Sequence, residues 1–223
     1  AQQYAKMMSE ARAQGALASA GDAQLRRLRA IAQRIVPFTG QWNERASQWR
    51  WEVNLIRSKE INAFCMPGGK IAFFTGILER LQLTDDEAAM IMGHEMAHAL
   101  REHASERIGK TQATGIGLSL AARLLGLGDL GDVAANIGTQ LLTLNFSRED
   151  ESEADLVGLE LAARAGYAPQ AGASLWRKMA EASGGGGGIA FLSTHPSGPQ
   201  RIRDLQANEP KVQGLYERAR RGG

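Results

Sequence analysis

The spacing of apolar residues predicts different elements in separate stretches of the first half of the chain. Leucine and isoleucine recur at helical spacing in residues 22–37, where Asp22 can cap a helix. Residues 49–56 alternate between apolar and polar and are rich in strand-forming types, so we expect a strand there. Two more strands, joined by a turn at 67–69, are predicted within residues 61–78.

Two capping boxes mark the starts of long helices further along. Thr84, with Glu87 three residues later, opens a helix that we expect to run to about residue 108. Ser147, with an aspartate three residues later, opens another helix, which Gly166 ends. These boundary signals make helix the dominant element of the second half of the chain.

The remaining stretches add further helices. Helices are expected at 169–182 and again from Pro199, which suits a first helical turn, while the glycine run at 184–188 is typical of a flexible loop. The pattern at 111–146 favours two core or lid helices over an element lying on a membrane surface, which would associate the chain peripherally with a membrane. The order of elements predicts the α+β class, mainly helical.

Composition and boundary signals suggest how the chain is organised. Hydrophobic residues make up 43% of the sequence, which is enough for a real core. We expect an N-terminal helical arm at 1–45, a main domain at 46–210 and a basic C-terminal tail at 211–223. The numbering begins without a methionine or a signal peptide, so we expect that a targeting leader has been removed.

Charge and cysteine content exclude some classes of function. The net charge of +2 is too small to indicate the excess of positive charge that is typical of nucleic-acid-binding domains. The single cysteine, Cys65, excludes an intrachain disulfide and a zinc finger built from cysteines. No uncharged apolar run reaches the ~18 residues that a membrane-spanning helix needs.

Three of the four histidines lie in the stretch "MIMGHEMAHALREH", residues 90–103. Residues four apart in a helix differ by roughly 40° around its axis, so His94 and His98 can present two imidazoles to one ion. Glu95 lies at the edge of that face, where it can reach a water molecule without binding the metal. This is the H-E-x-x-H pattern of zinc metalloproteases, and its apolar surroundings argue against two surface histidines.

A zinc ion of this kind needs a third protein ligand and an open position. Cys65, His195 and the acidic cluster after Ser147 are candidates, although Cys65 is better explained as a small apolar residue of a hairpin. His103 lies roughly 180° around the helix from His94, which excludes it from the same ion.

The acidic cluster contains a helical stripe formed by Glu151, Asp155, Gly158 and Ala162. The small residues suit close packing beneath the histidine helix. Glu151 would then bind the metal, and Asp155 would accept the spare N–H of a ligand histidine. The alternative is that 149–153 is a solvated acidic first turn, favoured by the helix dipole, as we expect for some of Glu149, Asp150 and Glu153.

Several motifs occur together in a particular order. "HEMAH" at 94–98 is followed by "ESEAD" at 151–155, with "NAFCMPGGKIAFFTGIL" before them and "THPSGPQRI" after them. From about residue 50 to 205 the chain resembles the gluzincin metallopeptidases of the HtpX and CAAX-prenyl-protease family, peptidase family M forty-eight. It is most similar to the soluble bacterial branch and the related mitochondrial inner-membrane protease.

The resemblance implies a zincin, gluzincin-like fold, with a small β-sheet or hairpin packed over the H-E-x-x-H helix. It also implies one Zn²⁺ per chain, held by His94, His98 and Glu151. Zinc lowers the pKa of a bound water molecule and polarises a carbonyl group, and Glu95 would act as the general base.

The histidine of the "HP" pair near the end of the chain also lies near the metal in this family. His195 would donate a hydrogen bond to the oxyanion or occupy zinc's open position, and the alternative is a surface loop histidine. Arg201 would pair with an acidic group near the site or be solvated. Asn62 and Ala63 are expected on the edge strand over the cleft, where an extended peptide can add, unless they belong to an ordinary hairpin.

Our first hypothesis is therefore a zinc endopeptidase with polypeptide substrates. The resemblance implies unfolded or damaged envelope proteins as substrates, and a periplasmic or membrane-associated location in bacteria. A second hypothesis is a binding or chaperone module with a silenced or structural zinc site, against which the intact Glu95 argues. A prenyl-protein protease is a third, disfavoured because that class uses several transmembrane helices.

Overall fold

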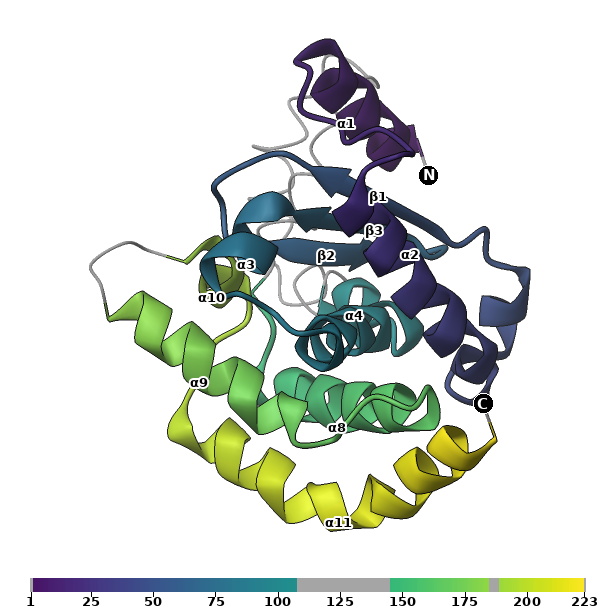
Figure 1. The fold of residues 1–223 in the computed structure, drawn as a ribbon, viewed down its shortest axis with the longest axis vertical. Helices are drawn as coiled ribbons and strands as arrows, with labels where there is room; N and C mark the ends of the chain where they lie inside the picture. The colour runs from purple at the N-terminus through teal and green to yellow at the C-terminus, as the bar shows by residue number, and fades with distance from the viewer. Residues whose placement is uncertain (1, 108–144, 185–188, 223) are drawn as a thin grey trace.

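A computed structural model describes residues 2–107, 145–184 and 189–222, and these residues are mainly helical with one small sheet (Figure 1). The predicted α+β class is confirmed at this level. The helices and strands are α1 Gln2–Ala13, α2 Ala23–Ile35, η1 Val36–Gln41, η2 Glu44–Gln48, β1 Glu52–Ile56, β2 Ala63–Met66, β3 Lys70–Phe74, α3 Thr75–Arg80, α4 Asp85–Leu100, α8 Arg148–Arg164, α9 Ala171–Ser183, α10 Ala190–Thr194 and α11 Pro199–Arg221. The predicted helices at 111–146 lie almost entirely outside the described residues.

The three strands form one sheet in the order β1-β3-β2. β3 runs parallel to β1 and antiparallel to β2. Because the order ends with β2, it is an edge strand of the sheet that the described residues form. The predicted hairpin between β2 and β3 is confirmed. Its turn contains Gly68 and Gly69 at φ of +84° and +77°, values that glycine adopts without steric cost.

Helices cover both faces of the sheet. One face carries Leu55, Ala63 and Phe73, which belong to the main core together with α2 and α4. The other face carries Ile56 and Phe64, which pack against α1. Figure 1 shows α4, α8 and α11 in succession on the side of the sheet opposite α1. The candidate residues of α4 are therefore held between the sheet and α8.

The first strand is shorter than predicted. We expected a strand over 49–56, but it begins at Glu52, and residues 49–51 connect it to the 3₁₀ helix η2 at 44–48. Asn43 caps η2 by accepting a hydrogen bond from the Arg45 N–H, and the Trp51 indole N–H donates to the Ala46 carbonyl at 3.1 Å. These local hydrogen bonds hold the preceding residues in a helical turn.

Both predicted capping boxes are confirmed. The end predicted for the histidine helix is wrong, because α4 ends at Leu100 and not near residue 108. The Asn43 side-chain N–H donates to the Leu100 carbonyl at 3.0 Å, and Glu102 adopts a left-handed φ of 58°. The chain turns there before residues 103–107 become helical again. His103 therefore does not continue the helical wheel of α4.

The proposed division into arm, main domain and tail stays a prediction. Within the arm, α2 packs against α4 and β1, and residues 211–221 continue α11. Among the described residues, no helix has both the length and the apolar character needed to cross a bilayer.

Two glycines let α4 and α8 approach each other at backbone distance. A Cβ atom at Gly158 would lie 2.7 Å from the His94 backbone nitrogen, and one at Gly93 would lie 2.8 Å from the Gly158 carbonyl oxygen. The close packing predicted from the small residues of α8 is therefore present. It brings the carboxylates of α8 next to the histidines of α4.

Replacing Gly158 with alanine is expected to lower the free energy of unfolding by about 1–3 kcal/mol, because the new methyl group meets backbone atoms that cannot yield easily. Urea unfolding followed by circular dichroism measures this change. The matched control is Gly214→Ala in α11, where the Cβ would meet only the end of the Arg218 side chain at 3.5 Å. The control should stabilise the helix by up to about 1 kcal/mol, and equal losses in both variants would contradict the argument.

Candidate metal centre

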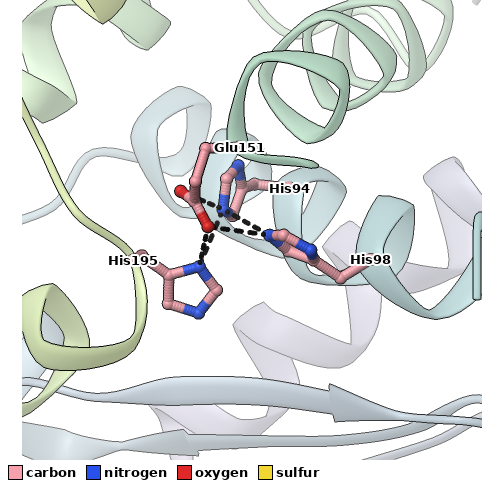
Figure 2. A group of neighbouring side chains, drawn as sticks. All are labelled: His94, His98, Glu151 and His195. Carbon is pink, nitrogen blue, oxygen red and sulfur yellow. Dashed lines mark hydrogen bonds and ion pairs between the residues drawn. The ribbon is translucent and has the colours of Figure 1, made fainter. Parts of the chain in front are cut away.

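Four buried side chains from three parts of the chain converge on one point (Figure 2). His94 and His98 come from α4 and Glu151 from the first turn of α8. His195 follows α10 immediately. All four are at most 4% exposed. The structure thus brings together the residues that the sequence nominated as ligands, along with the histidine of the "HP" pair.

The distances within this cluster suit a small cation. The His98 Nε2 lies 3.1 Å from the His94 Nε2, which lies 3.2 Å from the His195 Nδ1. The Glu151 Oε1 lies 2.9 Å from the His195 Nδ1 and 3.3 Å from the His98 Nε2. One ligand atom from each residue fits within a span of 4.8 Å. Ligand atoms about 2.0–2.1 Å from a tetrahedral zinc ion are about 3.3 Å apart, so the donor set fits Zn²⁺.

The outward-facing nitrogen of His94 has a carboxylate partner, as the stripe on α8 predicted. The His94 Nδ1 lies 3.1 Å from the Asp155 Oδ1. Arg201 donates to both oxygens of Asp155 at 2.7 Å and stacks over the Trp176 ring. Burial raises the pKa of Asp155, but the Arg201 charge and the hydrogen bonds from His94 and Arg201 together lower it by more, so the net pKa lies below its usual value. Asp155 is therefore an ionised acceptor that can hold the tautomer of His94.

The outward-facing nitrogen of His98 contacts His103, which the sequence analysis did not anticipate. The His98 Nδ1 lies 3.0 Å from the His103 Nδ1, and the His103 Nε2 lies 2.9 Å from the Glu153 Oε2. The helical wheel separated His103 from this region, but α4 ends at Leu100 and the turn at Glu102 brings His103 back toward His98. The sequence signal for it was a third histidine only five residues after His98.

Glu95 lies beside the cluster rather than within it. Its Oε1 is buried, has no hydrogen-bond partner among the described residues and lies 3.4 Å from the His195 Nε2. Burial raises the pKa of Glu95 above its usual value, although His195 and His94 oppose that effect. Such a carboxylate can accept a proton at neutral pH more readily than an exposed glutamate.

Burial and hydrogen bonding oppose each other in the ligand cluster. Burial raises the pKa of Glu151, but hydrogen bonds from His195 and His98 and the electrostatic effect of His94 together lower it by more, so the net pKa is far below normal. Burial lowers the pKa of His98 well below its usual value. It also lowers that of His94, but the Asp155 hydrogen bond and the Glu151 charge leave the net pKa raised. An ionised Glu151 and a neutral His98 are the states required of metal ligands.

A pocket lies between the cluster and the edge strand β2. Asn62 and Ala63 line it together with Glu95, and Cys65 lies on the same wall. Burial raises the pKa of the Cys65 thiol, and Cys65 does not belong to the group of residues close enough to share an ion. The pocket thus joins the edge strand β2 to the candidate catalytic carboxylate.

Two phenylalanines that the sequence analysis did not identify enclose the His195 ring. Phe191 stacks on it with ring centroids 4.4 Å apart, and Phe146 stacks at 5.1 Å. Phe146 also stacks on His98 at 3.8 Å. No short motif contains these rings, because they come from different segments that meet only in the folded chain.

Comparisons with known proteins agree with this geometry. The model of the family described as Peptidase family M48 matches residues 22–209 of the chain. The match includes both helices of the cluster, the edge strand and His195.

Individual relatives also match. The chain is 39% identical over 185 residues to the mitochondrial metalloendopeptidase OMA1 of Schizosaccharomyces pombe, covering 82% of this chain and 52% of that protein. It is 38% identical over 159 residues to the Arabidopsis thaliana protein of the same name, covering 71% and 32%. It is 28% identical over 160 residues to the metalloprotease LoiP of Escherichia coli, covering 67% and 59%. The chain spans from about a third to three-fifths of the length of these relatives.

Proposed function

The chain belongs to peptidase family M48, and on that premise we propose that it is a zinc-dependent endopeptidase with a gluzincin-like zincin fold. The observation that carries this proposal is the position of Glu95. One of its buried oxygens has no hydrogen-bond partner among the described residues. Glu95 lines a pocket that has His98 and His195 of the cluster on one side and a strand edge on the other. A purely structural metal site would not need that carboxylate.

The proposed division of roles follows from the distances. His94, His98 and Glu151 would hold a Zn²⁺ ion, which, when bound, activates a water molecule and polarises the substrate carbonyl group. Glu95 would take a proton from that water as its oxygen bonds to the carbonyl carbon. Glu95 would then deliver the proton to the leaving nitrogen as the peptide C–N bond breaks. Asp155 and Arg201 would keep His94 oriented.

The edge strand supports a polypeptide substrate. Within the described parts of the chain β2 pairs with β3 alone, and Asn62 and Ala63 line the pocket that leads to Glu95. An extended peptide can add to such an edge through backbone hydrogen bonds, which carry little sequence preference. We therefore propose unfolded or damaged proteins as the substrate class. The bacterial envelope, which we propose as the compartment, rests on the resemblance to the bacterial branch of the family.

Cleavage of casein by the purified chain tests the proposed activity. We expect fragments to appear, 1,10-phenanthroline to stop their formation and added Zn²⁺ to restore it. A chain that binds zinc but does not cleave casein or any other unfolded protein would favour a binding or chaperone module with a silenced site.

For His195, the position of Nδ1 among the ligand atoms favours occupation of zinc's open position over oxyanion stabilisation. His195→Ala is therefore expected to raise kcat/KM for casein. The increase should be about tenfold if the chain with that position open is ~10% populated. Initial rates at several casein concentrations measure it. A fall of about 10²–10³-fold would instead assign His195 to the oxyanion.

A further inference from the structure

The two candidate ligand histidines of α4 have different partners on their outward sides. His94 contacts Asp155, a buried carboxylate that Arg201 holds in place. His98 contacts another histidine, His103, which in turn contacts Glu153. The first partner belongs to the "ESEAD" motif of α8, whereas His103 belongs to no element of the proposed mechanism.

With His98 as a metal ligand, the hydrogen-bond directions along this second chain follow step by step. The His98 Nε2 faces the other ligand atoms, so its lone pair is needed there and the proton lies on Nδ1. The His98 Nδ1–H then donates to the His103 Nδ1 at 3.0 Å. His103 must carry its own proton on Nε2, which donates to the Glu153 Oε2 at 2.9 Å.

The last member of the chain has a partner of its own. The Arg101 Nε–H donates to the Glu153 Oε1 at 2.7 Å. His103 is only 2% exposed, whereas the Glu153 and Arg101 side chains are 40% and 42% exposed. The hydrogen bonds thus run from a solvent-facing ion pair, through one buried imidazole, to a candidate metal ligand.

The break in α4 makes this contact possible. His103 approaches His98 because the helix ends at Leu100 and Glu102 has a left-handed φ. Its ring meets the His98 ring at 75°, with centroids 5.0 Å apart. This edge-to-face arrangement lets the two Nδ1 atoms meet, as a directional hydrogen bond requires.

We propose that His103 is a positioning residue for the metal site: it accepts the His98 Nδ1–H and thereby directs the His98 Nε2 lone pair toward the ion. Glu153 holds His103 in the tautomer that makes this possible. The inference rests on the metal site of the proposed function. Outer partners of metal-binding histidines fix tautomer and ring orientation, and their loss typically costs 10–100-fold in metal affinity.

The test measures the zinc dissociation constant of the full chain by competition with a chromophoric chelator. His103→Phe keeps an aromatic ring but removes the acceptor, and should weaken zinc binding by about 10–100-fold. His103→Asn places an amide oxygen near the position of Nδ1, and should restore most of that affinity. The visible absorption spectrum of the Co²⁺-loaded protein should change in His103→Phe and return toward the wild type in His103→Asn.

A second pair of variants leaves the buried His103 ring unchanged. This pair therefore tests the positioning role even if His103→Phe does not fold. Glu153→Ala removes the half-exposed acceptor of His103 and should weaken zinc binding by about tenfold, the lower end of the range above. Glu149→Ala changes an exposed glutamate in the first turn of α8, serves as the matched control and should leave zinc binding unchanged.

The outcomes separate this inference from the proposed function. Zinc binding by the wild type with the expected losses supports both. Tight wild-type binding that neither Glu153→Ala nor a folded His103 variant weakens would overturn the positioning role and leave the proposed metal site standing. Absence of zinc binding by the wild type would overturn both.

Discussion

Glu95→Gln is expected to reduce casein cleavage by about 10²–10⁴-fold while the protein keeps one zinc ion per chain. The amide has nearly the same shape as the carboxylate, but it cannot accept the proton of the attacking water. Glu95 does not belong to the group of residues whose ligand atoms lie within 4.8 Å of one another, so zinc binding should survive. Initial-rate kinetics and metal analysis of the same preparation measure the two effects separately.

The control for this variant is Glu79→Gln. Glu79 is an exposed glutamate of α3, and it does not line the pocket next to Glu95. Its loss of charge is the same, but its activity should equal that of the wild type. If the Glu95→Gln enzyme cleaves casein at an unchanged rate, Glu95 is not the general base. If the variant loses its zinc, Glu95 contributes to metal binding instead.

The second large effect is expected at Glu151. Glu151→Gln should weaken zinc binding by more than about 100-fold, beyond what the loss of an outer partner costs, because it removes a negatively charged ligand of the ion. Its carboxylate is 1% exposed and its pKa is strongly depressed by hydrogen bonds from neighbouring histidines, so it is ionised at neutral pH. Cleavage should fall in parallel with the zinc content.

Metal analysis after dialysis, beside the wild type and Glu149→Gln, measures this effect. Glu149 lies in the same first turn of α8 but is exposed, so its variant should keep its zinc. The fold should survive in Glu151→Gln, because Arg201 still has its two hydrogen bonds to Asp155. A folded Glu151→Gln protein that retains stoichiometric zinc would remove Glu151 from the ligand set.

Relations within single elements were predictable from the sequence. Helix geometry alone places His94 and His98 on one face, and the same geometry places Glu151 one turn before Asp155. The capping boxes at Thr84 and Ser147 and the turn at 67–69 are likewise local, because each depends on hydrogen bonds or φ values of adjacent residues.

Relations between elements were decided by the tertiary structure. The meeting of α4 with α8 depends on backbone contact between Gly93 and Gly158, and the pairing of Arg201 with Asp155 depends on how α11 packs against α8. His103 reaches His98 because α4 ends at Leu100 and the chain turns at Glu102, next to a hydrogen bond from the distant Asn43 side chain to the Leu100 carbonyl. Sequence periodicity describes which face of a helix a residue occupies, but not where that helix ends or which other element meets that face. Those outcomes are set by packing and hydrogen bonds between residues distant in the chain.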